Sequence, residues 1–241
     1  MPPNRIELVK ASGLVSSYKK KYKPKERWDV EVFKDGAYIA PDMFSALTLL
    51  DAKVCDFGGT LYITDLYRSW DVQKKARDDF LSRKKKHFVA PPGGSFHNAG
   101  RAVDISIKEL NFEGEDREEW LQILWDIAVP LGFSPIITIP DIDASEAWHL
   151  DFPGDDWRIA YDCLSYVEVA KCAILDIGAW NPRENKDTLE SMYIQAQLIR
   201  LGKYEICKVD GIVGPKTNKV INDLGLFNCD KKDVIFHLSA M

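Results

Sequence analysis

The clearest alternation of apolar and polar positions falls within residues 102–107. Every second residue from Val103 to Ile107 is apolar, and Asp104 lies between them. Because successive side chains of a strand point to opposite faces, this spacing predicts a strand with one apolar face. Asp104 is then expected on the face opposite the apolar stripe.

Other segments show the periods of helices and further short strands. Apolar residues three and four apart predict helices that begin at about Asp42, Trp70, Asp116, Asp155, Asp187 and Pro215. Short apolar runs predict strands within residues 28–33, 37–41, 61–64, 132–138 and 147–152. Asp35–Gly36 between the first two runs predicts a hairpin. Strands and helices do not alternate regularly, which indicates an α+β fold with a small mixed or antiparallel sheet and flanking helices.

The sequence also predicts how several helices begin and which residues they bury. Asp42 and Asp187 are expected as helix caps, and Asp116 with Glu119 has the spacing of a capping box. Residues 155–175 are predicted to form one helix with a single apolar face. The residues of that face are Ile159, Cys163, Val167, Ala170 and Ile174.

Composition and charge exclude several classes of protein. The chain has 241 residues, of which 46% are hydrophobic and 29% charged, and this is typical of a globular protein. It has no run of roughly 18 apolar residues, so no membrane span is expected. The net charge of -5 disfavours nucleic-acid binding, which usually needs a basic surplus. The five cysteines are an odd number without C-x-x-C spacing, so neither a disulfide framework nor a cysteine zinc site is expected.

Three segments are predicted along the chain. Residues 1–27 form a basic N-terminal extension, and residues 28–180 carry the strands and most of the helices. The polar stretch 180–187 is the expected boundary, and residues 186–241 form a small helical domain. Each of the two domains has its own apolar pattern, so we expect residues 1–180 to fold alone.

Two of the four histidines stand beside acidic residues in a pattern that suggests a metal site. A catalytic zinc needs three protein ligands and an open position for water, and His97, Asp104 and His149 could supply the ligands. Glu146 could take a proton from the water as general base. Gly100 would allow the sharp bend that returns Asp104 towards His97. Positions 146 and 149 face opposite sides of an ideal strand, so the chain must turn there if both side chains reach one metal.

The motifs that contain these residues resemble a known family. Residues 95–104 read S-x-H-x-x-G-x-A-x-D, and residues 146–149 read E-x-W-H. Both are the motifs of the zinc D-alanyl-D-alanine peptidases, a family that includes carboxypeptidases, dipeptidases and phage L-alanyl-D-glutamate endopeptidases. Residues 67–73 resemble the family's Y-R-S-x-x-x-Q, although Asp65–Leu66 replaces the common Ser-Gly before it. The resemblance covers about residues 28–155.

The resemblance implies a role for each matching residue. It implies that His97, Asp104 and His149 bind Zn²⁺ and that Glu146 is the catalytic base. It also implies that Arg68 binds substrate or stabilises the negative charge of the tetrahedral transition state. The alternative for Arg68 is a surface salt bridge.

Further residues have less specific roles. The resemblance implies that Ser95 and Gln73 position substrate, and Trp148 either packs under the site or is a plain core aromatic. Asp151 is a candidate for orienting a ligand. His87 and His237 match neither motif and are expected to be structural or exposed.

The C-terminal segment resembles a second family, the three-helix peptidoglycan-binding module. Leu201–Gly202 is followed by D-G-x-x-G-x-x-T in residues 210–217. Residues 223–227 depart from the usual final Phe-Gln, so the fold is better supported than the ligand. The alternative is a helical domain that serves only as a dock or spacer.

Together these resemblances imply a zinc peptidase that cuts peptidoglycan stem peptides. Whether it is an endopeptidase or a D,D-carboxypeptidase stays open, as do the bond cut, the phage or bacterial origin and the oligomeric state. A non-catalytic wall-binding or virion protein that keeps the fold is the alternative from another class. No secretion signal is found in the first residues, so we expect synthesis in the cytoplasm and action on the wall after release, as in a phage lysin, or carriage in a virion. The basic run 83–86 is expected to be solvated surface, and contact with an anionic wall polymer is its alternative.

Overall fold

The computed structural model describes residues 6–11, 38–181 and 183–241. The α-helices in this part of the chain are α3 (Pro41–Asp56), α4 (Trp70–Leu81), α5 (Trp120–Ala128), α6 (Gly154–Cys163), α7 (Tyr166–Asp176), α8 (Lys186–Arg200), α9 (Pro215–Asp223) and α10 (Lys231–Ser239). The strands are β1 (Val9–Lys10), β2 (Tyr38–Ile39), β3 (Ile63–Asp65), β4 (Ala102–Ile105), β5 (Ser134–Pro135) and β6 (His149–Asp151). The 3₁₀ helices are η2 (Phe96–Ala99), η3 (Ile107–Glu109), η4 (Val129–Leu131) and η5 (Tyr204–Ile206). The α+β class with a small antiparallel sheet is confirmed.

The four-stranded sheet has the order β3-β4-β6-β5, and every pairing in it is antiparallel. Its register puts Asp104 opposite both Asp65 on β3 and His149 on β6. Facing residues of neighbouring antiparallel strands lie on the same side of the sheet, with their Cβ atoms roughly 5 Å apart. Three residues from distant parts of the sequence are therefore brought into one row.

The predicted N-terminal hairpin falls largely outside the described residues, which resume at Tyr38. Its second half, Tyr38–Ile39, forms β2 and pairs with β1, where Val9 lies opposite Ile39. The pairing connects the start of the chain to the beginning of α3.

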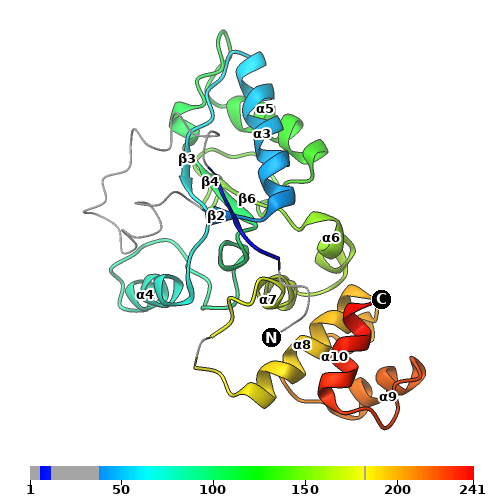
Figure 1. Cartoon of the computed structure of the whole chain (residues 1–241). Coiled ribbons are helices and arrows are strands. Elements are labelled where there is room, and N and C mark those ends of the chain that lie inside the picture. Colours follow the sequence, from blue (N-terminus) through cyan, green and yellow to red (C-terminus); the bar gives the residue numbers. More distant parts are fainter. Residues whose placement is uncertain (1–5, 12–37, 182) are drawn as a thin grey trace.

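Two hydrophobic cores lie on either side of the row of site residues. In the first core, α3 and α5 pack against the sheet through residues such as Leu47, Leu124 and Val103. Figure 1 shows these two helices side by side at one end of the molecule, with α8, α9 and α10 at the other. The second core contains residues of the five helices from α6 through α10, together with Phe96 and Ala99 of η2. None of the described helices has the length and apolar character needed to cross a membrane.

The structure replaces the predicted helix at 155–175 with two helices. Leu164 and Ser165 are extended (φ −115°, ψ 171° and φ −67°, ψ 141°), which ends α6 and starts α7. The predicted apolar face is wrong at three of its five residues, because Ile159 is 61% and Val167 37% exposed and Cys163 is also exposed. Ala170 and Ile174 are buried as predicted. The two helices bury different faces, so one continuous period could not describe both.

Several predicted helix starts also need correction. Asp42 lies inside the first turn of α3, where Pro41 is the first helical residue, and its carboxylate accepts a hydrogen bond from Arg101 at 2.8 Å. The helix expected at Asp116 begins at Trp120. The cap of α8 is Asn185, whose side chain accepts from the backbone N–H of Asp187. Asn185 therefore caps α8 with its side chain, whereas Ala40 before α3 and Glu119 before α5 make no side-chain cap hydrogen bond.

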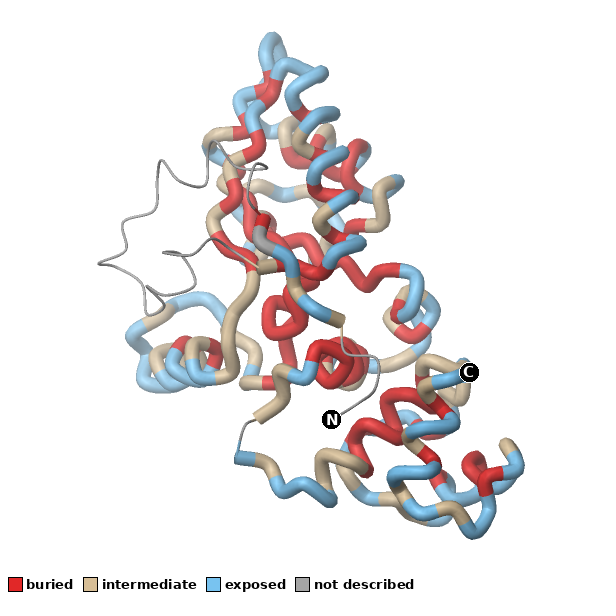
Figure 2. Tube along the Cα trace, viewed as in Figure 1, coloured by how far each residue is buried: buried red, intermediate tan, exposed pale blue. Residues whose placement is uncertain are grey.

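The second core crosses the predicted domain boundary at 180–187. Buried residues of α7 pack with buried residues of α8, and Figure 2 shows this burial on both helices. Glu168 of α7 accepts a hydrogen bond from the backbone N–H of Val209 at 2.6 Å, and Lys171 donates to the carbonyl of Val209 at 3.1 Å. The boundary remains a prediction, but a chain cut at 180 would expose the apolar face of α7.

The D-G turn of the C-terminal segment has a structural role. The side-chain oxygen of Gln195 accepts from the backbone N–H groups of Asp210 (3.0 Å) and Gly211 (2.9 Å), and its amide donates to the Asp210 carboxylate (2.8 Å). Gly211 has φ +78°, and a Cβ there would lie 2.5 Å from the side chain of Thr188. These motif residues therefore hold a loop against α8.

A buried carboxylate at the α7–α8 contact gives a first prediction. Burial raises the pKa of Asp176 to about 6, although the charge of Arg200 opposes the shift. The folded chain then binds more protons than the unfolded chain between about pH 4 and pH 6, so stability falls as the pH rises through that window. Two pKa units correspond to about 3 kcal/mol.

Asp176→Asn should remove this cost and raise the melting temperature at pH 7.5 by several degrees, at roughly 2–4 °C per kcal/mol. The advantage over the parent should disappear at about pH 4, where Asp176 is neutral. The matched control is Asp162→Asn on the exposed surface of α6. Calorimetric scans at both pH values test the prediction, and an Asp176→Asn variant with no gain at pH 7.5 would contradict it.

Candidate metal centre

His97 and Asp104 are brought together by a short helix and a glycine bend. His97 lies in η2, where the Ser95 hydroxyl accepts from the His97 backbone N–H at 3.3 Å. Gly100 ends η2 with φ +64°, and a Cβ there would lie 2.8 Å from Leu8. Strand β4 follows this bend, and its residue Asp104 lies beside His97, as the spacing predicts.

Glu146 and His149 are brought to one side by a turn before β6. Glu146 has φ +70°, in the left-handed region that few residues other than glycine adopt. Its carbonyl accepts a hydrogen bond from the His149 backbone N–H at 3.0 Å. The chain therefore turns between the two positions, as a shared site requires.

The donor atoms of His97, Asp104 and His149 lie within 4.8 Å of one another, and all three residues are buried. Asp104 Oδ1 is 3.1 Å from His97 Nε2 and 2.9 Å from His149 Nδ1. Bonds of about 2.0–2.1 Å in a tetrahedral zinc site place neighbouring ligand atoms roughly 3.3 Å apart. The three residues therefore fit a metal ion of this kind after small movements of the donor atoms.

The other nitrogen of each histidine is held by a separate partner. His97 Nδ1 lies 2.5 Å from the carbonyl oxygen of Leu66. A carbonyl oxygen only accepts, so Nδ1 donates to Leu66, and Nε2 is the nitrogen that faces Asp104 and is available to a metal once it carries no proton. His149 Nε2 lies 2.8 Å from the fully buried carboxylate of Asp151. Partners of this type orient histidine ligands in metal sites.

Two tyrosines hold Asp151 in turn. The hydroxyl of Tyr161 in α6 donates to Asp151 at 2.9 Å, and that of Tyr166 in α7 donates at 3.3 Å. Both helices belong to the second core. That core therefore supports the orientation of His149 through Asp151.

The charges of the cluster favour ionised Asp104 and protonated His149. Burial would raise the pKa of Asp104, but the charge of His97, hydrogen bonds from both histidines and the charge of Arg68 hold it well below its usual range. Burial would lower the pKa of His149, but Asp151 and Asp104 outweigh it and raise the pKa to about 10. A metal bound at Nδ1 would displace that proton.

Glu146 lines the same cavity as the cluster. Burial raises the pKa of Glu146, and the negative charge of Asp104 adds to that effect, whereas His149 opposes it. A carboxylate with a raised pKa is a better proton acceptor and donor near neutral pH. The position and environment of Glu146 suit an acid–base group.

Arg68 is bound to the row of sheet residues and is not a surface salt bridge. Its Nε donates to Asp65 and its Nη2 to Asp104, each at 2.9 Å. Its Nη1 reaches the side-chain oxygen of Gln73 at 3.4 Å, and only 19% of its side chain is exposed. Arg68 therefore steadies a candidate metal ligand as well as facing the cavity.

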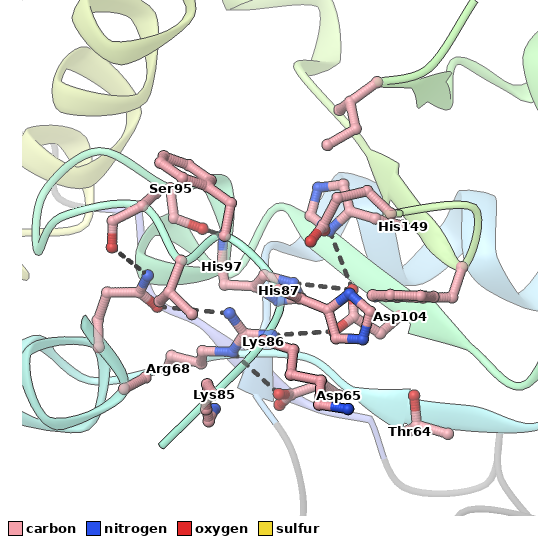
Figure 3. Close-up of a pocket in the computed structure, with 18 of the residues that line it drawn as sticks. Thr64, Asp65, Arg68, Lys85, Lys86, His87, Ser95, His97, Asp104 and His149 are labelled. Atoms are coloured by element: carbon pink, nitrogen blue, oxygen red, sulfur yellow. Dashed lines mark hydrogen bonds and ion pairs between the residues drawn. The ribbon is translucent and has the colours of Figure 1, made fainter. Parts of the chain in front are cut away.

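One cavity of about 840 Å³ is lined by all eight residues to which the resemblance gives a catalytic, substrate-binding or metal-binding role. They are Arg68, Gln73, Ser95, His97, Asp104, Glu146, Trp148 and His149. Figure 3 labels five of them, Arg68, Ser95, His97, Asp104 and His149. Gln73 is fully buried and donates to the carbonyl of Ala90 at 2.8 Å, so it also shapes the wall of the cavity. Trp148 is half-buried and packs on the first core.

The sequence reasoning missed several residues that build the site. Asp65 and Leu66 stand where the family motif has Ser-Gly, yet Asp65 binds Arg68 and Leu66 binds His97. Asn98 donates to the carbonyl of Arg68 at 2.7 Å and so fixes the Arg68 turn. The three-residue spacing of Asp65 and Arg68 was the one available signal. His87, expected to be structural or exposed, is exposed and lines the cavity.

Comparison with known proteins finds a family match over the segment that carries the site. Residues 36–155 match the VanY family, described as D-alanyl-D-alanine carboxypeptidase. The Bacillus subtilis (strain 168) protein YodJ, to which a carboxypeptidase activity is ascribed, is 37% identical over 134 residues. The match covers 48% of this chain and 47% of YodJ, so the chain spans about half the length of that relative. A solved structure of the LD-carboxypeptidase LdcB aligns with a TM-score of 0.38 and 21% identity, over 67% of this chain and 92% of that chain.

The fold brings His97, Asp104 and His149 into a buried donor cluster that could hold a metal ion. Over residues 36–155 the chain resembles the VanY family of D-alanyl-D-alanine carboxypeptidases. The resemblance expected from the two motifs is confirmed.

Proposed function

We propose that the chain is a zinc-dependent peptidase that hydrolyses the stem peptides of bacterial peptidoglycan. The observation that carries the proposal is the single cavity that contains three buried metal donors and Glu146. The match of residues 36–155 to the VanY family supports the substrate class. The match to a carboxypeptidase family favours removal of a C-terminal residue from the stem peptide. Cleavage within the stem peptide by an endopeptidase is the alternative activity.

In this proposal the candidate residues of the cavity divide the reaction among them. His97 Nε2, Asp104 and His149 Nδ1 hold the zinc ion, which when bound would polarise the scissile carbonyl and acidify a water molecule. Glu146 takes the proton from the attacking water and passes it to the leaving amine. Arg68 keeps Asp104 in place and adds positive charge where negative charge develops. Ser95 and Trp148 bound the space that the peptide occupies.

A non-catalytic wall-binding protein is the alternative, and the geometry disfavours it. A protein that needs only the fold does not require three buried metal donors and a carboxylate, Glu146, at one cavity. We also propose that the chain works at the cell wall, either after release from the cell in which it is made or from a virion. Residues 186–241 would then contact the wall or dock the catalytic part.

The zinc dependence can be tested on a soluble stem peptide that ends in D-alanyl-D-alanine. The full chain should release a product detectable by liquid chromatography. Removal of the metal with a chelator should stop hydrolysis, and stoichiometric Zn²⁺ should restore it. Unchanged activity after verified metal removal would contradict the proposal.

Asp151 provides a second test of the metal site. Asp151→Asn keeps the shape of the side chain but removes the charge that faces His149 Nε2, so zinc affinity should fall about 10–100-fold. The control is Tyr161→Phe, which removes a hydrogen bond to the other carboxylate oxygen and should have a smaller effect. Competition with a zinc-binding dye measures affinity, and melting of the metal-free forms separates it from stability. Equal affinity of Asp151→Asn and parent would show that Asp151 does not orient His149.

A further inference from the structure

The segment between α4 and η2 brings positive charge to the wall of the metal cavity. Lys85, Lys86 and His87 all line the cavity. Figure 3 shows their side chains at the same cavity as His97 and Asp104. None of the three belongs to a motif of the family.

The backbone of this segment is held at both ends. At its start, the N–H groups of Lys84 and Lys85 donate to the carbonyl of Asp79 at 2.8 and 3.1 Å. At its end, Arg77 donates to the carbonyl of Val89 at 2.6 Å. The cations between these points are therefore carried by an ordered wall.

A ring contact connects the segment to the strand that supplies a metal ligand. The His87 ring meets the Trp148 ring edge-on, with centroids 5.3 Å apart and an interplanar angle of 84°. Trp148 directly precedes His149. A group bound at the segment would thus lie beside a peptide held at the proposed metal.

Within the part of the chain that the structure describes, the acidic residues Asp65 and Asp104 of the cavity already form ion pairs, whereas Lys86 does not. Asp65 and Asp104 are both bound to Arg68. Lys86 forms no ion pair with any residue among those described. Lys84, by contrast, directs its ammonium to Asp79 at 3.8 Å and does not line the cavity.

We propose that Lys86, supported by the charge of Lys85, forms a subsite that binds a carboxylate of the substrate peptide away from the bond that is cut. The inference rests on the proposed function, because it specifies which feature of a stem peptide the cavity recognises. An ammonium on a flexible stem binds a carboxylate as a compact point charge. Stem peptides offer such carboxylates at the C terminus and on acidic residues, and both sources share this chemistry.

The test compares full-length variants on four synthetic stem peptides. One peptide carries both carboxylates, two carry one of them as an amide, and the last carries both as amides. Lys86→Gln should raise KM about fivefold on the first peptide with kcat unchanged, the scale of one exposed ion pair. The matched control, Lys84→Gln, should keep the parent KM. The singly amidated peptide on which parent and Lys86→Gln become equal identifies the carboxylate that is bound.

Each result decides between the subsite and its alternatives. Equal KM values for parent and Lys86→Gln on every peptide at low salt would overturn the subsite, while hydrolysis by both would still support the proposed function. A difference that persists on the doubly amidated peptide, or that occurs only on intact walls, would also overturn it. If the parent hydrolyses none of the peptides, calorimetric binding decides instead. Weaker binding by Lys86→Gln than by parent and Lys84→Gln would support the subsite without turnover, and equal binding would overturn it.

Discussion

Replacing both His97 and His149 with alanine should abolish zinc binding and hydrolysis together. The double variant leaves Asp104 as the single donor of the buried cluster. Loss of an outer hydrogen-bond partner already costs about 10–100-fold in metal affinity, so loss of two ligands should cost far more. Elemental analysis of protein purified without added metal should find one zinc per parent chain and none in the variant.

The matched control for this variant is His237→Ala in α10, far from the cluster in sequence and absent from the lining of the cavity. It should keep both zinc and activity. Zinc retained in full by the double variant would show that the ion binds elsewhere and would remove the basis of the site.

Glu146→Gln should keep the zinc but lower kcat at least about 100-fold, the usual minimum for a lost general acid–base group. Glutamine has nearly the same size, so the left-handed turn and the cavity should persist, whereas the amide cannot accept a proton from water. The measurement is steady-state hydrolysis of the soluble stem peptide, with zinc content determined on the same samples.

Glu109→Gln serves as the control for charge removal, because Glu109 lies in η3 and does not line the cavity. It should have the kcat of the parent. Full activity of Glu146→Gln would exclude Glu146 as the base, and a loss of zinc in that variant would make it a metal ligand instead.

The candidate site could be predicted further from the sequence than the fold could. His97, Asp104 and His149 were identified because few residue types bind zinc and because their motifs are specific. Their meeting also depends on strand register, which places Asp104 opposite His149. Strand register depends on contacts between strands that are far apart in the chain. The sequence therefore indicates which residues could bind a metal, but it does not indicate that Asp65 lies opposite Asp104 in the sheet.

Helix boundaries were predicted less well, for a physical reason. The apolar period across residues 155–175 fits one helix, but the break at Leu164 turns Tyr166 towards Asp151. Tyr161 and Tyr166 find their partner only in the folded chain, so local spacing gives no signal for them. The period of α7 is also hard to detect. This helix contacts both η2 and α8, so its buried residues do not lie on one face alone.

The most direct test of the account is mass spectrometry of purified peptidoglycan after digestion by the zinc-loaded chain. The account predicts new stem peptides shortened at a D-alanyl bond, or cut within the stem if the enzyme is an endopeptidase. These products should be missing after digestion with Glu146→Gln. Intact stem peptides after prolonged digestion with the zinc-loaded parent, under conditions in which a known peptidoglycan hydrolase cuts them, would contradict the account.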